Sequence, residues 1–291
     1  MSTMGSHGTP PGGQDLQAWV GRTETLTDIV TAAPVMGLSA TLGDRADVPA
    51  NPGDPLPPLW VWIYFLPIVS MAQVGPDGHP KRGGFLPPIA LERRMWAGGR
   101  LTFHAPIRVG DRLEKTSTIL KVSEKSGRSG TMVFLTVRHE IRVGGALAVD
   151  EEQDIVYLAI PETFSPPPAT PVPDGAWREP VTMDPVKLFR FSALTFNGHR
   201  IHYDRPYAMD VEKYPGLVVH GPLQALMLFE AGRRRHPGRT PAGFTFRGMR
   251  PLFDFDAITL TGAAREDGGL DLYTANGDGA VGMQAALSFT S

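Results

Sequence analysis

The chain has 291 residues, of which 42% are hydrophobic and 20% are charged, proportions typical of a globular protein with a sizeable core rather than a disordered one. A formal net charge of -2 gives no basic surplus for nucleic acid or for an anionic membrane surface, so we expect neither partner. The lack of cysteine excludes disulfides, thiolate nucleophiles and cysteine-ligated metal sites. No stretch resembles a signal peptide or approaches the roughly 20 apolar residues of a membrane span, and we expect a cytoplasmic protein.

The first half opens with a leader, residues 1–14, that we expect to be flexible. A strand is predicted at residues 28–30 and a short helix at 36–42. The run LWVWIYFL, residues 59–66, is apolar on every side, so we expect it to be buried as the central helix of this half. A glycine- and proline-rich loop follows at residues 75–88, and loops of this length are often functional or mobile. Alternating or clustered β-branched and aromatic residues then predict antiparallel strands at 101–107, 113–122, 131–143 and 147–160.

A proline-dense stretch, residues 161–180, cannot continue a sheet and is typical of a semi-rigid spacer. We therefore place the domains at residues 15–161 and 181–291, with a linker at 162–180. In the second domain we predict a strand at 186–195, a helix at 218–231 and strands at 244–253, 258–264, 270–275 and 281–290.

An internal repeat relates the two halves. Residues 101–103 (LTF) precede Asp111 by the same spacing as residues 244–246 (FTF) precede Asp254, and the same offset aligns Thr118 with Thr261. Each half is therefore predicted to be one buried helix wrapped by an antiparallel sheet. This is an α+β architecture, a double hot dog in which two tandem units form a pseudo-dimer.

Groups suited to proton transfer gather in FNGHRIHYD, residues 196–204, and YPGLVVHGP, residues 214–222. Three histidines, an asparagine and an aspartate lie there, close in sequence to a glycine that enters a predicted helix, which predicts an active site. His199, His202 and Asp204 are possible metal ligands. No fourth ligand or standard motif accompanies them, so we predict no metal.

The stretches FSALTFNGHRIHYDRPYA and YPGLVVHGPL resemble the second half of the MaoC-like double hot dog hydratases and dehydratases, which act on acyl thioesters. The resemblance is closest to the mesaconyl-CoA and itaconyl-CoA hydratases and the mitochondrial-type 3-hydroxyacyl-thioester dehydratases. In the first half it extends to LPPLWVWIYF, DGHPKRGGFLPP, RRMWAGGRLTF and the HE of VRHEIRV. It implies a hydro-lyase that reversibly hydrates an α,β-unsaturated acyl thioester, with the coenzyme A thioester as substrate and no cofactor.

The resemblance also implies roles for single residues. His202 falls on the family's catalytic histidine, while Asn197 stands where the family has its catalytic aspartate; an amide holds water but exchanges no proton. Hydration needs a proton acceptor for water, a proton for the α-carbon and donors for the enolate oxygen, and we expect the N–H of Gly221 to be such a donor. Further substrate contacts are expected from His199, Arg200, Tyr203, Asp204 and His220.

Several alternatives stay open. His199 either orients the substrate or supports its loop, and Asp204 either fixes Arg205 or the loop, or orients His202. Arg200 either points into the pocket, where a substrate carboxylate would pair with it, or faces outward toward Asp204, Asp210 or a coenzyme A phosphate. Arg93-Arg94 and Lys81-Arg82 are either solvated charges or contacts for those phosphates.

The inward arrangement of Arg200 favours a short branched dicarboxylic acyl-CoA, such as mesaconyl-CoA or itaconyl-CoA. The alternative is a 3-hydroxyacyl-ACP or 3-hydroxyacyl-CoA dehydratase of fatty acid synthesis. From another class, a hot dog thioesterase or a non-catalytic acyl-CoA-binding protein is the competing interpretation. We expect the first domain to close the substrate tunnel without catalytic groups, and a homodimer is an option.

Overall fold

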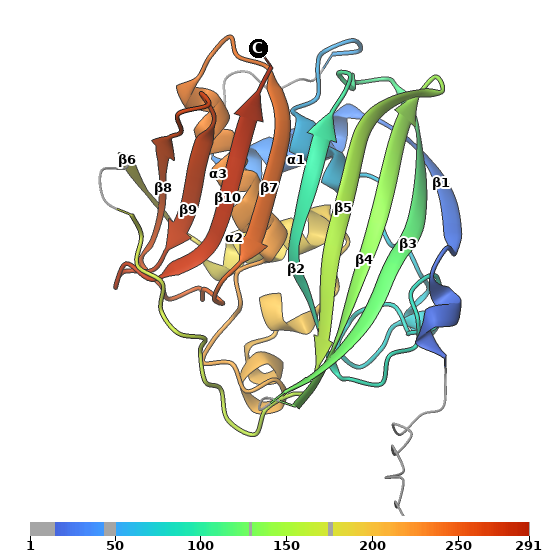
Figure 1. The fold of residues 1–291 in the computed structure, drawn as a ribbon, viewed down its shortest axis with the longest axis vertical. Helices are drawn as coiled ribbons and strands as arrows, with labels where there is room; N and C mark the ends of the chain where they lie inside the picture. Colours follow the sequence, from blue (N-terminus) through green and yellow to red (C-terminus); the bar gives the residue numbers. More distant parts are fainter. Residues whose placement is uncertain (1–14, 44–50, 128–129, 174–176, 291) are drawn as a thin grey trace, which may run out of the picture.

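The computed structural model describes residues 15–43, 51–127, 130–173 and 177–290, and the predicted leader lies outside these residues. The strands form one antiparallel sheet in the order β1-β3-β4-β5-β2-β7-β10-β9-β8-β6 (Figure 1). Their bounds are β1 (Thr23–Ile29), β2 (Arg93–Phe103), β3 (Arg112–Gly127), β4 (Gly130–Val143), β5 (Ala146–Leu158), β6 (Trp177–Val181), β7 (Pro241–Gly248), β8 (Ile258–Ala264), β9 (Leu270–Ala275) and β10 (Val281–Phe289).

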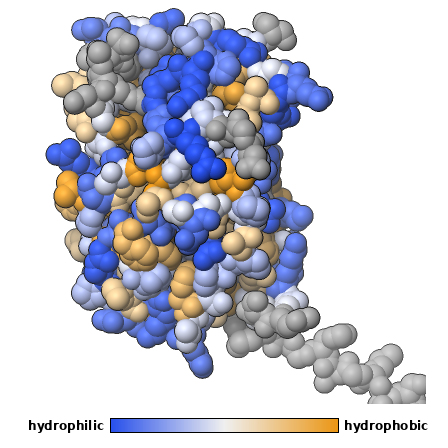
Figure 2. Space-filling view, turned by 90° about the vertical axis from the view of Figure 1, so that its left-hand side faces the viewer, coloured by the Kyte–Doolittle hydropathy of each residue, from blue (hydrophilic) through white to orange (hydrophobic). Residues whose placement is uncertain are grey.

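Three α-helices lie on one face of the sheet: α1 (Ala32–Leu42), α2 (Pro185–Leu194) and α3 (Gly221–Arg235) (Figure 1). The short turns of helix are η1 (Leu16–Trp19), η2 (Pro58–Ile63), η3 (Met71–Gln73), η4 (Arg200–His202) and η5 (Tyr207–Val211). No helix in the described ranges is long and apolar enough to cross a membrane. On the β6 side of the molecule, apolar side chains are interspersed with hydrophilic ones (Figure 2).

Read outward from the junction of β2 and β7, the strands of the two halves follow one another in corresponding order. On one side the order is β2, β5, β4, β3, β1, and on the other β7, β10, β9, β8, β6. At the junction Leu101 pairs with Phe244, and the two flanking pairs, Arg100 with Thr245 and Thr102 with Gly243, are related by exchanging the halves. Because Leu101 and Phe244 are equivalent residues of the sequence repeat, the pseudo-twofold axis passes through this pair. The double hot dog is confirmed.

The long helix α3 forms the centre of the core. Pro222 stands in its first turn, where a missing N–H costs nothing, and the run of leucine, alanine and methionine that follows has high helix propensity. Leu223 to Gly232 are buried, and three arginines in the last turn complement the helix dipole. The helix packs on β2 and β7 to β10, so it crosses the junction between the two halves.

Two predicted elements of the core were wrong in type or length. Residues 186–195 form the helix α2 rather than a strand, because Asp184 accepts the N–H of Lys187 at 2.8 Å as an N-cap and Pro185 begins the first turn. The apolar run 59–66 is largely buried as predicted, but it forms only the short turn η2. Prolines at positions 57, 58 and 67 leave no room for a longer helix.

The end of the proline-dense spacer also differs from the prediction. Trp177–Val181 forms β6, which pairs with β8, although it contains Pro180. Because β6 is the edge of the sheet, a proline there removes no hydrogen bond from a second neighbour. The remaining strands agree with the predicted segments within a few residues at most ends. The larger exceptions are β1 and β2, which begin earlier than predicted, β3, which extends further, and β7, which ends sooner.

Candidate active site

The loop after α2 turns two histidines inward. Phe196 adopts a positive φ of 50°, and the N–H of Asn197 donates to the carbonyl of Ser192 at 2.8 Å, which ends the helix. The side-chain oxygen of Asn197 accepts the N–H of His199 at 3.1 Å, and the turn η4 follows. His199 and His202 are consequently buried, with 4% and 7% of their surface exposed.

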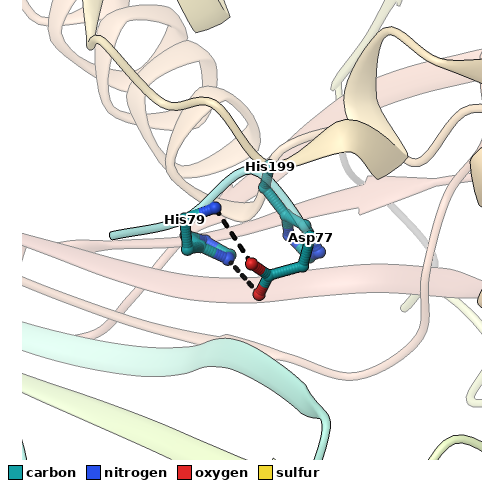
Figure 3. A group of neighbouring side chains, drawn as sticks. All are labelled: Asp77, His79 and His199. Carbon is teal, nitrogen blue, oxygen red and sulfur yellow. Dashed lines mark hydrogen bonds and ion pairs between the residues drawn. The ribbon is translucent and has the colours of Figure 1, made fainter. Parts of the chain in front are cut away.

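Four imidazole rings lie next to one another in the core of the site. His79, from the first half, lies 4.2 Å between ring centres from His199. His199 lies 5.5 Å from His202, and His202 stacks on His220 at 3.6 Å. Figure 3 shows His79 and Asp77 of the first half beside His199 of the second. The cluster is therefore built from both halves, although a set from the second half alone was expected.

Hydrogen bonds decide which ring nitrogen carries the proton. His202 donates from Nδ1 to the carbonyl of Val218 at 2.7 Å, so its Nε2 keeps the lone pair. His79 donates from Nδ1 to Asp77 Oδ2 at 3.0 Å, which leaves Nε2 free. His199 donates from Nε2 to Glu212 Oε1 at 2.9 Å, which leaves Nδ1. Three neighbouring rings each keep one basic nitrogen.

Burial keeps His79, His202 and His220 neutral. It lowers the pKa of His79 and of His220 to about 3. Burial, together with the nearby His220 and His199, holds the pKa of His202 well below its usual value. At neutral pH the lone pairs are therefore available as proton acceptors, because burial disfavours the charged form of an imidazole. The cluster is chemically a group of bases.

A buried ion pair between Glu212 and Arg93 holds His199 in place. Glu212, 1% exposed, accepts from His199 and also from Arg93 Nε at 3.1 Å, while the Arg93 guanidinium donates to the Glu212 carbonyl as well. Arg93, considered above as a solvated charge or a phosphate contact, is instead buried against Glu212 and over the ring of Tyr214. Neither Glu212 nor its link to Arg93 was predicted, because a lone glutamate in a polar loop carries no sequence signal.

Arg200 takes the outward arrangement. Its Nε and one terminal nitrogen donate to Asp204 at 2.9 and 2.7 Å, another donates to the Pro76 carbonyl at 3.1 Å, and the guanidinium lies over the ring of Tyr207. Asp204 binds Arg200 and not His202. Arg205 pairs with Asp254.

Tyr203 and His220 differ in their relation to the imidazole cluster. Tyr203 is exposed and donates its hydroxyl to the carbonyl of Gly198 at 2.8 Å, so it lies outside the cluster. His220 belongs to it, fully buried, with Nε2 at 2.8 Å from the hydroxyl of Ser192.

The N-terminus of α3 opens beside the histidines. Among the described residues, nothing accepts a hydrogen bond from the N–H of Gly221, the first residue of the helix. A Cβ there would lie 3.6 Å from the Trp96 carbonyl and 3.9 Å from Met283 Cε, which is ordinary contact. Trp96 also lines a cavity of about 140 Å³, together with Trp62, Phe65, Lys115 and Thr195. The helix N-terminus thus offers a donor for an oxyanion.

One set of side chains has the composition of a metal site. The ligand atoms of Asp77, His79 and His199 lie within 4.8 Å of one another (Figure 3). Both oxygens of Asp77 already accept hydrogen bonds, one from the ring and one from the backbone N–H of His79. The set considered from the sequence, which included Asp204, does not come together. The absence of a metal stays a prediction.

Known proteins resemble this chain over most of its length. The model of the family described as hydroxyacyl-thioester dehydratase type 2 matches residues 59–254. The chain is 47% identical over 280 residues to the mesaconyl-C(4)-CoA hydratase of Chloroflexus aurantiacus, covering 94% of this chain and 97% of that protein. It is 29% identical over 262 residues to the mitochondrial hydroxyacyl-thioester dehydratase type 2 of Schizosaccharomyces pombe, covering 78% and 86%.

Solved structures share the fold. A MaoC-like dehydratase superposes with a TM-score of 0.70 at 14% identity, covering 95% of this chain and 100% of that one. A Mycobacterium tuberculosis protein described as having a double hotdog fold superposes with a TM-score of 0.60 at 13% identity, covering 93% and 96%. With the family match, these comparisons confirm the predicted kinship with MaoC-like hydro-lyases. The chain belongs to the hydroxyacyl-thioester dehydratase type 2 family.

Proposed function

We propose that this protein reversibly adds water to the double bond of an α,β-unsaturated acyl-CoA whose acyl group is a short branched dicarboxylic acid, such as mesaconyl-C4-CoA or itaconyl-CoA. The observation that carries the reaction is the neutral His202, with a free Nε2 lone pair, next to the open N-terminus of α3. The relative named mesaconyl-C(4)-CoA hydratase, which aligns over nearly the whole chain, supports the substrate.

In this mechanism the water oxygen bonds to the β-carbon while His202 Nε2 takes one of the water protons. The electron pair of the double bond moves toward the thioester oxygen, and the N–H of Gly221 stabilises the negative charge that develops there. His202 then returns its proton to the α-carbon, so water is added with no net change in the enzyme. Dehydration is the same path in reverse.

The guanidinium of Arg94, rather than that of Arg200, supports the proposal of a substrate with a free carboxylate. Arg94 lies on the same sheet face as Trp96 and opposite Tyr157, and it is half-buried. Burial lowers the pKa of His79 to about 3, and the charge of Arg94 acts in the same direction. Among the described residues, none accepts a hydrogen bond from the Arg94 guanidinium or forms an ion pair with it. A half-buried guanidinium of this kind favours an anionic ligand.

The alternative, a 3-hydroxyacyl dehydratase of fatty acid synthesis, is supported by two relatives named as mitochondrial hydroxyacyl-thioester dehydratases. Both are less similar to this chain than the mesaconyl-C(4)-CoA hydratase, at 29% and 21% identity against 47%.

A panel of thioesters tests the proposal. Purified protein is given mesaconyl-C4-CoA, itaconyl-CoA and a straight-chain enoyl-CoA, while loss of the conjugated double bond and release of free thiol are followed separately. The proposal requires loss of the double bond, fastest with a dicarboxylic substrate. Thiol release instead would establish a thioesterase, and preference for a long neutral chain would establish the fatty acid dehydratase.

The variant Arg94→Gln tests the contact with the carboxylate. It should lower kcat/KM for the dicarboxylic substrate by about 1.5–3 kcal/mol, the range for a hydrogen bond to a charged group, and affect a neutral enoyl-CoA much less. Arg200→Gln is the matched control, because its guanidinium is already paired with Asp204. An equal effect of Arg94→Gln on both substrates would contradict the assignment. The cytoplasmic location, the homodimer, the absence of a cofactor and the choice of coenzyme A over acyl carrier protein stay predictions.

A further inference from the structure

A water molecule that attacks a β-carbon has two O–H groups, and each is held in place by an acceptor. His202 Nε2 is one acceptor. Asn197 stands where a second acceptor is expected from the resemblance, but its side-chain oxygen already receives the N–H of His199 at 3.1 Å, and an amide carries no charge. The second acceptor of the water is therefore either the remaining nitrogen of His199, Nδ1, or a group from the first half of the chain.

A tight hairpin of the first half reaches the loop that carries His199 and His202. Val74 and Pro80 form an isolated antiparallel bridge, and the N–H of Gly75 donates to the His79 carbonyl at 2.7 Å. Gly78, with a φ of 89°, closes the turn through its own N–H to the carbonyl of Gly75 at 3.0 Å. The turn presents Asp77 and His79 side by side (Figure 3).

The hairpin is fitted against the catalytic loop by backbone contact. A Cβ at Gly78 would overlap the carbonyl oxygen of Gly198, and a Cβ at Gly198 would overlap the carbonyl oxygen of Gly78. Only glycine at both positions permits this approach. The N–H of Arg200 donates to the Asp77 carbonyl at 2.9 Å and fixes the register. His79 is held on His199 by a contact between the halves that tolerates no side chain.

The free nitrogen of His79 remains accessible. Nδ1 is bound to Asp77, and among the described residues Nε2 has no hydrogen-bond partner. In the described chain, the buried side-chain atoms that lack a partner are His220 Nδ1 and Thr261 Oγ1, so Nε2 of His79 is not fully buried. Of the His79 side chain, 16% is exposed. Nε2 of His79 is thus a lone pair open to a small molecule.

We propose that His79, held by Asp77, is a second catalytic residue: its Nε2 accepts one O–H of the attacking water while His202 Nε2 removes the other proton. The inference rests on the proposed hydration. The O–C bond forms at the β-carbon, the removed proton goes to His202 and then to the α-carbon, and the O–H bound to His79 remains as the hydroxyl of the product. The first half then supplies a catalytic group in addition to closing the substrate tunnel.

The test uses the full chain and the thioester on which the wild type is most active. His79→Ala should lower kcat by ~10²-fold, the lower end for a positioned acid or base. Asp77→Asn, which keeps an acceptor for Nδ1–H but removes the charge, should lower it by about tenfold. His104→Ala, at an exposed histidine of the same half, is the matched control and should be as active as the wild type.

A rescue separates catalysis from support of the fold. Asn197→Asp places a carboxylate in the same loop, and in the His79→Ala background it should recover at least about tenfold in kcat and give the pH–rate profile a new acidic limb. The melting temperatures of all variants are measured alongside. Full activity in a folded His79→Ala protein would overturn the proposal, and so would an Asn197→Asp change that acts identically with and without His79. A wild type that hydrates no enoyl thioester would instead refute the proposed function.

Discussion

His202 donates its Nδ1–H to the backbone carbonyl of Val218 over 2.7 Å, and the N–H of Val218 donates back to the carbonyl of Ile201 at 3.0 Å. This two-way contact ties the catalytic loop to the segment that enters α3. It holds the imidazole in one tautomer and one orientation, with Nε2 as the only basic nitrogen of the ring. Because a backbone carbonyl is the partner, no other titrating side chain decides the protonation state of Nδ1.

We expect His202→Ala to lower kcat by ~10²-fold or more while the protein stays folded, because the proton acceptor next to the N-terminus of α3 is lost. Steady-state rates and a melting curve at the assay pH check this, with His104→Ala as the control for losing an imidazole elsewhere. A folded His202→Ala protein that turns over at the wild-type rate would show that another residue takes the proton.

We expect Gly221→Ala to lower kcat/KM by about tenfold or more without loss of stability. The added methyl meets the protein only at ordinary contact distance, but it stands at the helix N-terminus where the thioester oxygen must approach the N–H. Gly248→Ala is the matched control, since its Cβ would lie 3.5 Å from the Ala97 carbonyl. Equal rates in the two variants would argue against an oxyanion contact at Gly221.

The sheet was predictable because each strand carries its own alternation and turn residues, and because the repeat made the strand of Leu101 equivalent to that of Phe244. The pairing of these two residues across the junction was not predicted. The helix α2 was not predictable, since its ten residues contain valine and phenylalanine, which favour strands, and the deciding signal is the N-cap Asp184 with Pro185. In the site, His202 follows from the resemblance and Gly221 from the chemistry of a helix N-terminus. Asp77 and His79 lie more than a hundred residues away in sequence, and only the tertiary fold brings them to His199.

The protein should become less stable as the pH decreases, because protonation of the buried histidines favours the unfolded chain. Burial lowers the pKa of His79, His139 and His220 to about 3 and holds that of His202 well below its usual value, against about 6.5 in the unfolded chain. Below pH ~6.5 the unfolded chain binds protons that the native state does not, so the stabilisation present above that pH is lost as the pH falls toward 3.

Urea unfolding at pH 7.5, 6, 5 and 4 measures the effect. The midpoint should be highest at pH 7.5 and should decrease at each step, with an unchanged slope m. Burial raises the pKa of Glu151 and of Asp256, which works in the opposite direction, but these are two groups against four. A midpoint that stays constant from pH 7.5 to pH 5 would contradict the neutral state of the cluster.

Activity should not depend on a bound metal. Asp77 is already engaged through both oxygens with His79, so a cation would have to break these bonds before it could bind. Dialysis against EDTA should leave the hydration rate as it was. A loss of rate that a divalent ion restores would show that Asp77, His79 and His199 form a metal site.

The two halves should not function apart, because they share a sheet, a core and the site. Backbone bonds between β2 and β7 join them at Leu101 and Phe244. Trp60 of the first half donates to the buried Glu230 on α3 at 2.9 Å, and Arg93 of the first half pairs with Glu212. Cutting the chain between the halves exposes the edge of β7 and leaves Glu212 and Glu230 without these partners.

Expressed alone, residues 177–291 should therefore aggregate or form a swapped dimer in which β7 pairs with β7 of a second copy, since an unpaired strand beside an apolar face seeks another edge. Size-exclusion chromatography and the hydration assay check this, and co-expression with residues 1–173 is the control, which should give a soluble 1:1 complex with activity. The pseudo-dimer requires that complex, because the first fragment supplies both the β2 edge and His79. A soluble monomeric fragment of residues 177–291 that hydrates the thioester by itself would contradict both the shared sheet and the shared site.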